Sequence, residues 1–346
     1  MNGAENLLPF ELPTTLAFFI SAAGLTGLAL LFCLVHLVLS PFARPRPPAL
    51  WLLSERACEE LVRRLNKDSR SARELKVRGF FLTLAMAVFG LLIGVAAQRI
   101  AGYPLGWVAT FLLLCATVSA MGPVRLLQRA ARAEAPIDRA AIASLLRPIV
   151  RDSFDHADAH TLARRTLETG VVGLNLFFVM PLFWFMLGGA PAMMVVVMVS
   201  ALAVAAEDAA QGQRQPFVRV VRAISGWFEI IPAWLTGLLV SLAAFFVSRA
   251  APRKALAVMF SQARTFRPSR QGVPVAALAG ALGVTLGGPR RHENGHSVAH
   301  GWVGAKGTSA RVPRGDLQRA ALLQLVVFML VMVAVALVLA LPARFV

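Results

Sequence analysis

The sequence has few charged residues and many apolar ones. Only 15% of its 346 residues are charged, whereas 57% are apolar, and the mean hydropathy is +0.66. So much apolar surface cannot be hidden inside one ordinary soluble core. Several runs approach the ~20 apolar residues that a membrane-spanning helix needs, and they alternate with Arg-rich polar blocks. We therefore expect an all-α fold: a polytopic integral membrane helical bundle of about six to seven spans, with amphipathic cytoplasmic helices.

Acidic residues are scarce, which gives a formal net charge of +17. In a soluble protein this charge would suggest nucleic acid. Here the Arg residues flank hydrophobic blocks, where anionic headgroups and the positive-inside rule place them. We therefore expect membrane lipid and no nucleic acid as a partner, and an inner-membrane location; partner membrane proteins or a homo-oligomer stay open.

Cysteine is also scarce. Cys33 and Cys115 lie in apolar runs, Cys58 lies in a polar one, and no C-x-x-C pair is present. Neither a disulfide framework nor a thiolate metal site is therefore indicated, and the pattern predicts buried, reduced thiols.

The first thirteen residues contain no Lys or Arg, the opposite of a cleaved signal peptide, so the first apolar run is expected to be a retained span. Of the expected spans, 191–206 is short, and 228–248 carries Glu229 and Pro232 near its start. The expected spans are 14–39, 79–97, 104–121, 170–189, 191–206, 228–248 and 319–341.

Two Arg-rich segments predict the topology of the first half. Segment 41–78 holds ten Lys or Arg residues and segment 122–169 holds eight, so both are expected in the cytoplasm. Simple alternation would then put 249–318, with eleven, on the outer side. Either this long loop escapes the charge rule, or one of the two weaker spans turns back as a re-entrant segment.

The polar segment 54–75 predicts an amphipathic helix. It opens with Ser54 ahead of Glu55, and Leu61 with Leu65 forms a narrow apolar stripe beside charged faces. Such a helix suits a membrane surface or a protein partner, and a solvated helix without a partner fits equally well.

Residues 292–296, "HENGH", match the H-E-x-x-H ligand pattern of zinc metalloproteases. Zinc chemistry needs both His residues on one rigid helix, whereas Asn294-Gly295 is a strong turn signal. We therefore expect a polar loop and no catalytic metal. Adventitious or regulatory binding by His292, His296 and His300 stays open.

A second His pair lies in the expected cytoplasmic segment. His156 and His160 are mixed with aspartates, which would suit a divalent ion if the segment is helical. An acidic helix start, capped by Asp152 or Ser153, is the favoured interpretation.

The glycines of "VPVAALAGALGVTLGGP", residues 273–289, form the third pattern. They could bring backbone N–H groups close to a phosphate, but the spacing is neither a Walker A motif nor a dinucleotide fingerprint. Close helix packing in a membrane explains the spacing equally well. The segment is too short to span comfortably and predicts a packed loop–helix element.

This glycine block resembles the A-G-A-L-G-V-x-L-G-G-P element of the CobD/CbiB family of cobalamin-biosynthesis membrane proteins. Three further blocks are similar in the same order: "IVRDS" at 149–153, "LETGVVGLNLFFVMPLFWFMLGGAP" at 167–191, and "IIPAWLTGLLVSLAA" at 230–244. The resemblance covers about residues 120–290. It divides the chain into N-terminal spans (1–121, with the helical segment 41–78), a CobD/CbiB-like core (122–290), and a polar loop with a C-terminal span (291–346).

The resemblance implies an ATP-dependent amide ligation. An aminopropanol or its phosphate would be joined to a propionate of adenosylcobyric acid, with ATP and Mg as cofactors and a corrinoid as substrate. It implies that Arg151 pairs with phosphate or carboxylate, and that Asp152 or Glu168 serves Mg²⁺ or an amine. Substrate or phosphate binding would fall to Ser269, Gly287 and Gly288.

The sequence departs from the family at most other polar positions. Amide ligation through an acyl phosphate needs carboxylates for Mg²⁺ and cations for phosphate. An active ligase and a catalytically degenerate member therefore both stay open. The family's acidic, amide and basic residues fall here on Val172, Gly173, Leu176, Ser225, Gly226, Glu229, Trp234 and Val275.

"MPLFWFMLGG" at 180–189 and the apolar tail 319–341 also resemble AmpE, a membrane family associated with β-lactamase induction. This resemblance implies a non-catalytic signalling or regulatory protein. It ranks second, because that family lacks the A-G-A-L-G-V element.

Overall fold

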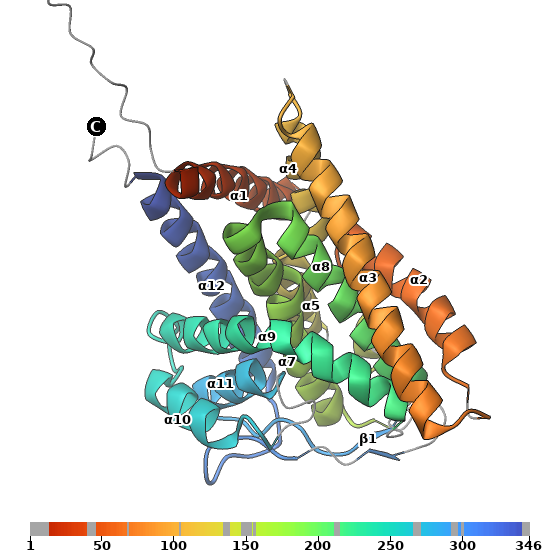
Figure 1. Cartoon of the computed structure of the whole chain (residues 1–346). Coiled ribbons are helices and arrows are strands. Elements are labelled where there is room, and N and C mark those ends of the chain that lie inside the picture. The colour runs from red at the N-terminus through yellow and green to blue at the C-terminus, as the bar shows by residue number, and fades with distance from the viewer. Residues whose placement is uncertain are drawn as a thin grey trace, which may run out of the picture.

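The computed structural model is an all-helical bundle with one very short strand pair, and it confirms the expected fold class (Figure 1). It describes residues 14–39, 46–67, 69–103, 105–133, 139–146, 154, 157–210, 215–265, 271–291, 297–298 and 301–340. The elements are α1 (Thr14–Leu39), α2 (Ala49–Leu65), α3 (Ala72–Ile100), α4 (Trp107–Thr117), α5 (Met121–Arg132), α6 (Arg139–Leu146), α7 (Ala159–Leu174), the π-helix η1 (Asn175–Val179), α8 (Met180–Ala210), α9 (Pro216–Ala243), α10 (Pro252–Gln262), α11 (Gly272–Leu282), β1 (Arg290–Arg291), β2 (Ser297–Val298) and α12 (Arg314–Ala340).

Within these residues five helical stretches are long and apolar enough to cross a membrane. They are α3, α4 with α5, α7 to α8, α9 and α12, and α1 contributes a shorter apolar stretch. The outward surface of α3 is strongly apolar: Phe81 and Leu92 are each 61% exposed, and Phe89 is 54% exposed. A surface of this kind is stable only against lipid. The chain is therefore a multi-pass membrane protein.

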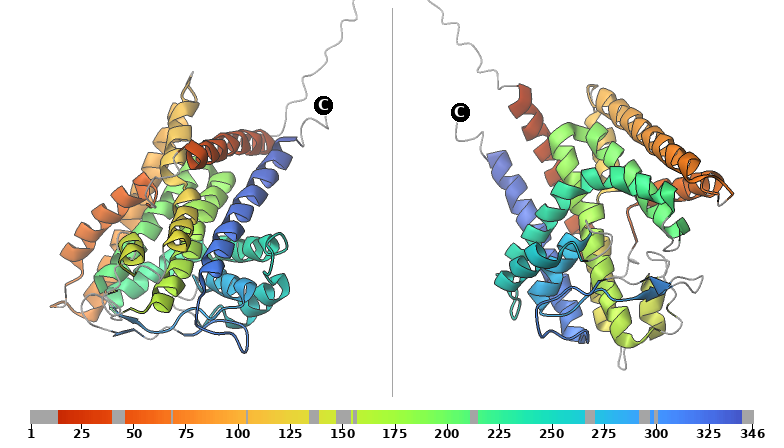
Figure 2. Two further views of the ribbon diagram at one scale, coloured as in Figure 1. Left: turned by 180° about the vertical axis from the view of Figure 1, so that it is seen from behind. Right: turned by 60° about the horizontal axis from the view of Figure 1, so that its bottom comes forward.

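The longest apolar stretch, Ala159–Ala210, is a hairpin of two spans. Gly188 and Gly189 leave helical geometry, and Gly189 has a φ of 66°, which favours glycine. Ser200 then lies 3.9 Å from the Met180 sulfur, although twenty residues of straight helix would separate them by about 30 Å. The two arms are side by side (Figure 2). The sequence-based spans 170–189 and 191–206 correspond to these arms.

Small residues on α3 allow close packing against the second arm of α8. A Cβ atom on Gly94 would lie 2.6 Å from the Ala190 carbonyl oxygen, and one on Gly90 would lie 2.6 Å from the Met194 carbonyl oxygen. Gly90 and Gly94 form a G-x-x-x-G pair, the spacing that lets two membrane helices approach at backbone distance. This contact fixes the second arm of the α8 hairpin against α3.

Helix α9 starts and ends toward the same end of the bundle. Its first turn packs against the start of α3, where a Cβ on Gly79 would lie 2.9 Å from the Phe217 carbonyl oxygen. Beyond its other end, the Arg249 carbonyl oxygen accepts a hydrogen bond from Arg319, near the start of α12. In Figure 1 α9 accordingly runs across the bundle rather than along it. Arg249 and the start of α12 thus lie toward the same end of the bundle as the start of α3, which simple alternation would not give, and the re-entrant alternative fits α9.

Helix α2 differs from its sequence-based expectation. It begins at Ala49, after Pro48, and it ends at Leu65. Ser54 therefore lies inside the helix, where its hydroxyl donates to the Leu50 carbonyl. Leu61 is exposed, and the face that packs toward α8 is formed by Trp51, Ser54, Cys58 and Val62. The helix starts earlier than expected because the apolar residues "ALWLL" at 49–53 form its first turns.

The three cysteines are free thiols, as expected. Cys33 and Cys58 are buried, and Cys115 is partly buried. Burial raises the pKa of the Cys58 thiol to about 12, so the reactive thiolate is almost absent at neutral pH.

Candidate functional site

Helix α7 begins directly after an acidic capping residue. Asp158 caps the helix, and its carboxylate accepts the Thr161 N–H at 3.0 Å. Hydrogen bonding to Thr161 lowers the pKa of Asp158 below its ordinary value, so the cap is charged at neutral pH. The expected caps Asp152 and Ser153 lie outside the described residues, and α7 starts further along the chain.

Arg165 and Glu168 form a buried ion pair about two helical turns inside α7. Arg165 Nη1 donates to Glu168 Oε2 at 2.7 Å, and the two side chains are only 8% and 3% exposed. The other carboxylate oxygen, Oε1, accepts the N–H of Gly287 at 2.6 Å. Residues 119 positions apart are thereby joined. Because both oxygens have partners in a water-poor site, the carboxylate is held in one orientation.

The glycines that follow meet different needs. Gly283 ends α11 in the left-handed conformation, with a φ of 69°. A Cβ on Gly280 would collide with the Lys254 carbonyl oxygen, so this glycine allows α10 and α11 to pack closely. Gly287 and Gly288 both have a φ near +90°. The first two glycines therefore shape the helix pair, and the last two shape the loop.

We call the region around Glu168 the α7–loop junction: Arg165 and Glu168 on α7, the Gly287–Gly288 turn, and Trp302. A Cβ on Gly288 would lie 2.5 Å from the Trp302 ring. The Arg164 guanidinium lies over the same ring, 5.2 Å from its centre. Its Nη1 also donates to the Ala310 carbonyl at 2.8 Å. The indole is therefore held between α7 and the glycine turn, and it is still 47% exposed.

The structure brings together two of the six sequence-based site residues, Glu168 and Gly287, and places Gly288 beside them. Arg151, Asp152 and Ser269 lie outside the described residues. The sequence analysis did not single out Arg165 or Trp302. For Arg165 the available signal was its i,i+3 spacing to Glu168. For Trp302, a lone Trp in a polar loop, the sequence gave no signal.

The described residues contain no group of three or more His, Cys, Asp or Glu side chains able to hold a metal ion. Residues 292–296 and His300 lie outside them, as does His156. On either side of 292–296, β1 and β2 pair as antiparallel strands, with Arg291 opposite Ser297. His160 Nδ1 lies 3.4 Å from the Val312 carbonyl oxygen, so its ring faces the loop after β2.

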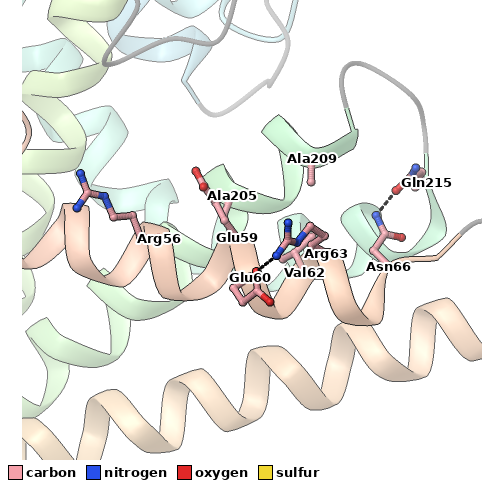
Figure 3. A pocket seen from close by; sticks show the side chains of 9 residues that line it. All are labelled: Arg56, Glu59, Glu60, Val62, Arg63, Asn66, Ala205, Ala209 and Gln215. Carbon is pink, nitrogen blue, oxygen red and sulfur yellow. Dashed lines mark hydrogen bonds and ion pairs between the residues drawn. The ribbon is translucent and has the colours of Figure 1, made fainter. Parts of the chain in front are cut away.

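A polar groove of about 500 Å³ lies between the end of α2 and the end of α8 (Figure 3). Charged side chains of both signs line it along α2, and the Asn66 amide donates to the Gln215 side chain at its far end. Sequence analysis recognised the charged faces of α2 but not the partner elements that turn them into a groove. The lining residues are Arg56, Glu59, Glu60, Val62, Arg63, Asn66, Ala205, Ala209 and Gln215.

The family can now be assigned. A family model described as CobD/Cbib protein matches residues 29–324. The chain belongs to the CobD/CbiB family. The match includes both halves of the α7–loop junction and the groove on α2.

Several curated relatives share the CobD/CbiB assignment. The "Cobalamin biosynthesis protein CobD" of Brucella anthropi is 28% identical over 263 residues, which cover 71% of this chain and 78% of that protein. The protein of the same name from Mycobacterium tuberculosis is 29% identical over 307 residues, covering 86% and 90%. That of Rhodobacter capsulatus is 36% identical over 137 residues, covering 38% and 40%. No solved structure matches the chain.

The positions at which the resemblance places polar family residues lie mostly inside the bundle. Leu176 in η1 and Val275 in α11 are buried. Ser225 is buried as well, and its hydroxyl donates to the buried carboxylate of Glu229. In the same region the Thr236 hydroxyl donates to the Asn175 amide oxygen at 2.9 Å, which joins α9 to η1. In these two pairs the polar groups bind one another.

Proposed function

We propose that this chain acts in cobalamin biosynthesis, at the step that joins an aminopropanol or its phosphate to a propionate of adenosylcobyric acid. The proposal also places the chain in the cell inner membrane, with 41–78 and 122–169 in the cytoplasm. The names of its relatives and the match over 29–324 support the pathway. Both Arg-rich segments are expected on the same side of the membrane, and α9 starts and ends toward one end of the bundle. This supports the proposed orientation, with these segments in the cytoplasm.

The observation that carries the proposal is the hydrogen bond from the Gly287 N–H to Glu168. It joins the block that begins at Leu167 to the G-G-P block, the two parts of the sequence that most resemble the family. A buried, charge-assisted contact of this kind holds the two blocks in one fixed arrangement. The contact therefore supports a working site at the α7–loop junction.

The described residues do not fit a magnesium nucleotide by themselves. Both oxygens of Glu168 are engaged by Arg165 and Gly287, and the described part of the chain contains no group of three or more His, Cys, Asp or Glu side chains that could hold a metal ion. Mg²⁺ with bound phosphates needs free carboxylate oxygens. The role open to Glu168 here is to position the glycine turn.

A catalytically degenerate member is the second candidate. The observation that favours it is the burial of Leu176 and Val275 at positions where the family carries polar groups. The AmpE-like signalling alternative rests on 180–189 and the C-terminal span alone. The CobD/CbiB match is broader, so we rank AmpE below both.

Complementation separates these candidates. A strain that lacks its own CobD/CbiB protein would receive the chain on a plasmid, with membrane insertion checked by an epitope tag and cobinamide measured directly. Restored cobinamide synthesis establishes the ligase. Normal insertion without cobinamide overturns the ligase proposal and supports the degenerate member. A change in β-lactamase induction without any effect on cobinamide would favour the AmpE-like alternative.

A further inference from the structure

Aromatic and cationic side chains gather where α9 ends and α10 begins. Phe245 and Phe246 are 67% and 66% exposed, and Arg249, Arg253 and Lys254 are exposed just after them. We call these five residues the basic aromatic corner. Figure 1 shows this part of the chain at the periphery of the bundle, next to the lower part of α12.

The cations of the corner have no acidic partner among the described residues. No Asp or Glu occurs in the sequence between Glu229 and Glu293, although eight Lys or Arg residues do. Arg253 and Lys254 also lie in the first turn of α10, where the positive end of the helix dipole adds to their charge instead of offsetting it. The corner therefore carries a positive charge that no acidic side chain in the described part of the chain offsets.

A further guanidinium lies close by. Arg319 on α12 donates through Nη1 to the Arg249 carbonyl oxygen at 3.1 Å, and through Nη2 to Asp316. The contact holds the Arg249 backbone against the start of a spanning helix. Arg249 and Arg319, which are distant in the sequence, are thus held side by side at the same level of the bundle.

The surface next to the corner is apolar and faces outward. Along α9, Trp227, Ile231, Leu238 and Leu242 are between 46% and 73% exposed. They recur at helical spacing and lead to Phe245 and Phe246. A ligand that covers both parts must carry an anionic group at one end and a long apolar part at the other.

We propose that the basic aromatic corner binds an anionic phospholipid. Its phosphate would lie against Arg249, Arg253 and Lys254, and its acyl chains against Phe245, Phe246 and the outward face of α9. A soluble phosphate compound would satisfy the cations but would leave both phenyl groups in water. A zwitterionic lipid would cover the phenyl groups but would not offset the charge. The proposal does not depend on the reaction that the chain carries out.

Native mass spectrometry of the purified full-length protein tests this proposal. Phosphatidylglycerol and phosphatidylcholine with identical acyl chains would be titrated separately, and the bound fraction measured. The double variant Arg249→Gln/Arg253→Gln is expected to weaken phosphatidylglycerol binding about thirtyfold, because each cation near an anionic surface contributes about fivefold. Phosphatidylcholine binding should not change.

The matched control is Arg73→Gln/Lys76→Gln, which removes two exposed cations from the start of α3. It is expected to bind phosphatidylglycerol as the unmodified protein does. A second variant, Phe245→Ala/Phe246→Ala, keeps every charge and should weaken binding of both lipids. Equal losses in the two charge variants, equal affinity for the two lipids, or displacement of the lipid by inorganic phosphate at the same concentration would each overturn the proposal.

Discussion

Replacement of Glu168 by Gln should destabilise the protein strongly. Gln keeps one oxygen for the Gly287 N–H but presents an N–H₂ group to Arg165, so the 2.7 Å ion pair is lost. Removing one member of a buried pair costs roughly 3 to 5 kcal/mol, because the other charge is left without compensation. The bond to Gly287 also weakens by about 1 kcal/mol when its acceptor is no longer charged.

A loss of about 4 kcal/mol corresponds to a fall in Tm of about 8 °C or more, at roughly 2 °C per kcal/mol for a chain of this size. The buried cysteines provide the assay. A thiol-reactive fluorophore cannot reach Cys58 in the folded protein, where burial also raises the thiol pKa to about 12. Its fluorescence therefore reports unfolding as the protein is heated.

Two controls make the result specific. Glu60→Gln removes a carboxylate that is 40% exposed and pairs with Arg63 and Arg64 at the surface; it should leave Tm almost unchanged, because exposed ion pairs are screened by water. The double variant Arg165→Met/Glu168→Gln should recover part of the lost stability, because no unpaired charge remains. If Glu168→Gln and Glu60→Gln melt at the same temperature, or the double variant is the least stable, the proposed role of the pair is wrong.

Three further predictions concern packing, topology and the H-E-x-x-H pattern. Gly94→Ala should lower Tm, because overpacking against the α8 backbone costs roughly 1 to 3 kcal/mol. The control Gly24→Ala, with no atom within 4 Å of its new Cβ, should raise Tm slightly. Equal shifts in Tm for the two variants would contradict the packing argument. Alkaline-phosphatase fusions after Lys67 and Lys254 should both be inactive, because 41–78 is proposed to be cytoplasmic and Lys254 follows the end of α9 that lies toward the same end of the bundle; activity at either would defeat this topology. Glu293→Gln should leave complementation intact, whereas a zinc hydrolase would lose about 10²-fold to 10⁴-fold of its activity with its general base.

Local sequence signals predicted much of the bundle. The first expected span, 14–39, coincides with α1, because a continuous apolar run has one stable arrangement in lipid. Gly188 and Gly189 lie at the boundary expected between 170–189 and 191–206. The packed loop–helix element expected at 273–289 is α11 with its glycine turn, and every residue of α11 is buried. In each case the decisive physics lies within about twenty consecutive residues.

Only part of the candidate site could be predicted, because its contacts join residues that are far apart in the sequence. Glu168 and Gly287 were selected separately, through a resemblance, and nothing in their local sequence indicates that they touch across 119 positions. Arg165 was missed because an Arg near a Glu on a helix is common on exposed surfaces. Its burial depends on how α7 packs against α5 and α12, which periodicity does not encode.

The path of α9 shows most clearly where sequence reasoning ends. Its length and apolar character fit a full crossing, and that assignment leaves 249–318, with eleven cations, on the outer side. The structure removes this conflict by holding both ends of the helix toward one end of the bundle, through Phe217 beside Gly79 and Arg249 beside Arg319. Neither contact is local. The positive-inside rule had left two explanations open, a long loop that escapes the rule or a re-entrant segment, and the tertiary packing of α9 favours the second. The same path carries Phe245, Phe246 and Arg249 to the periphery, where a helix that crossed fully would have placed them at the opposite end of the bundle.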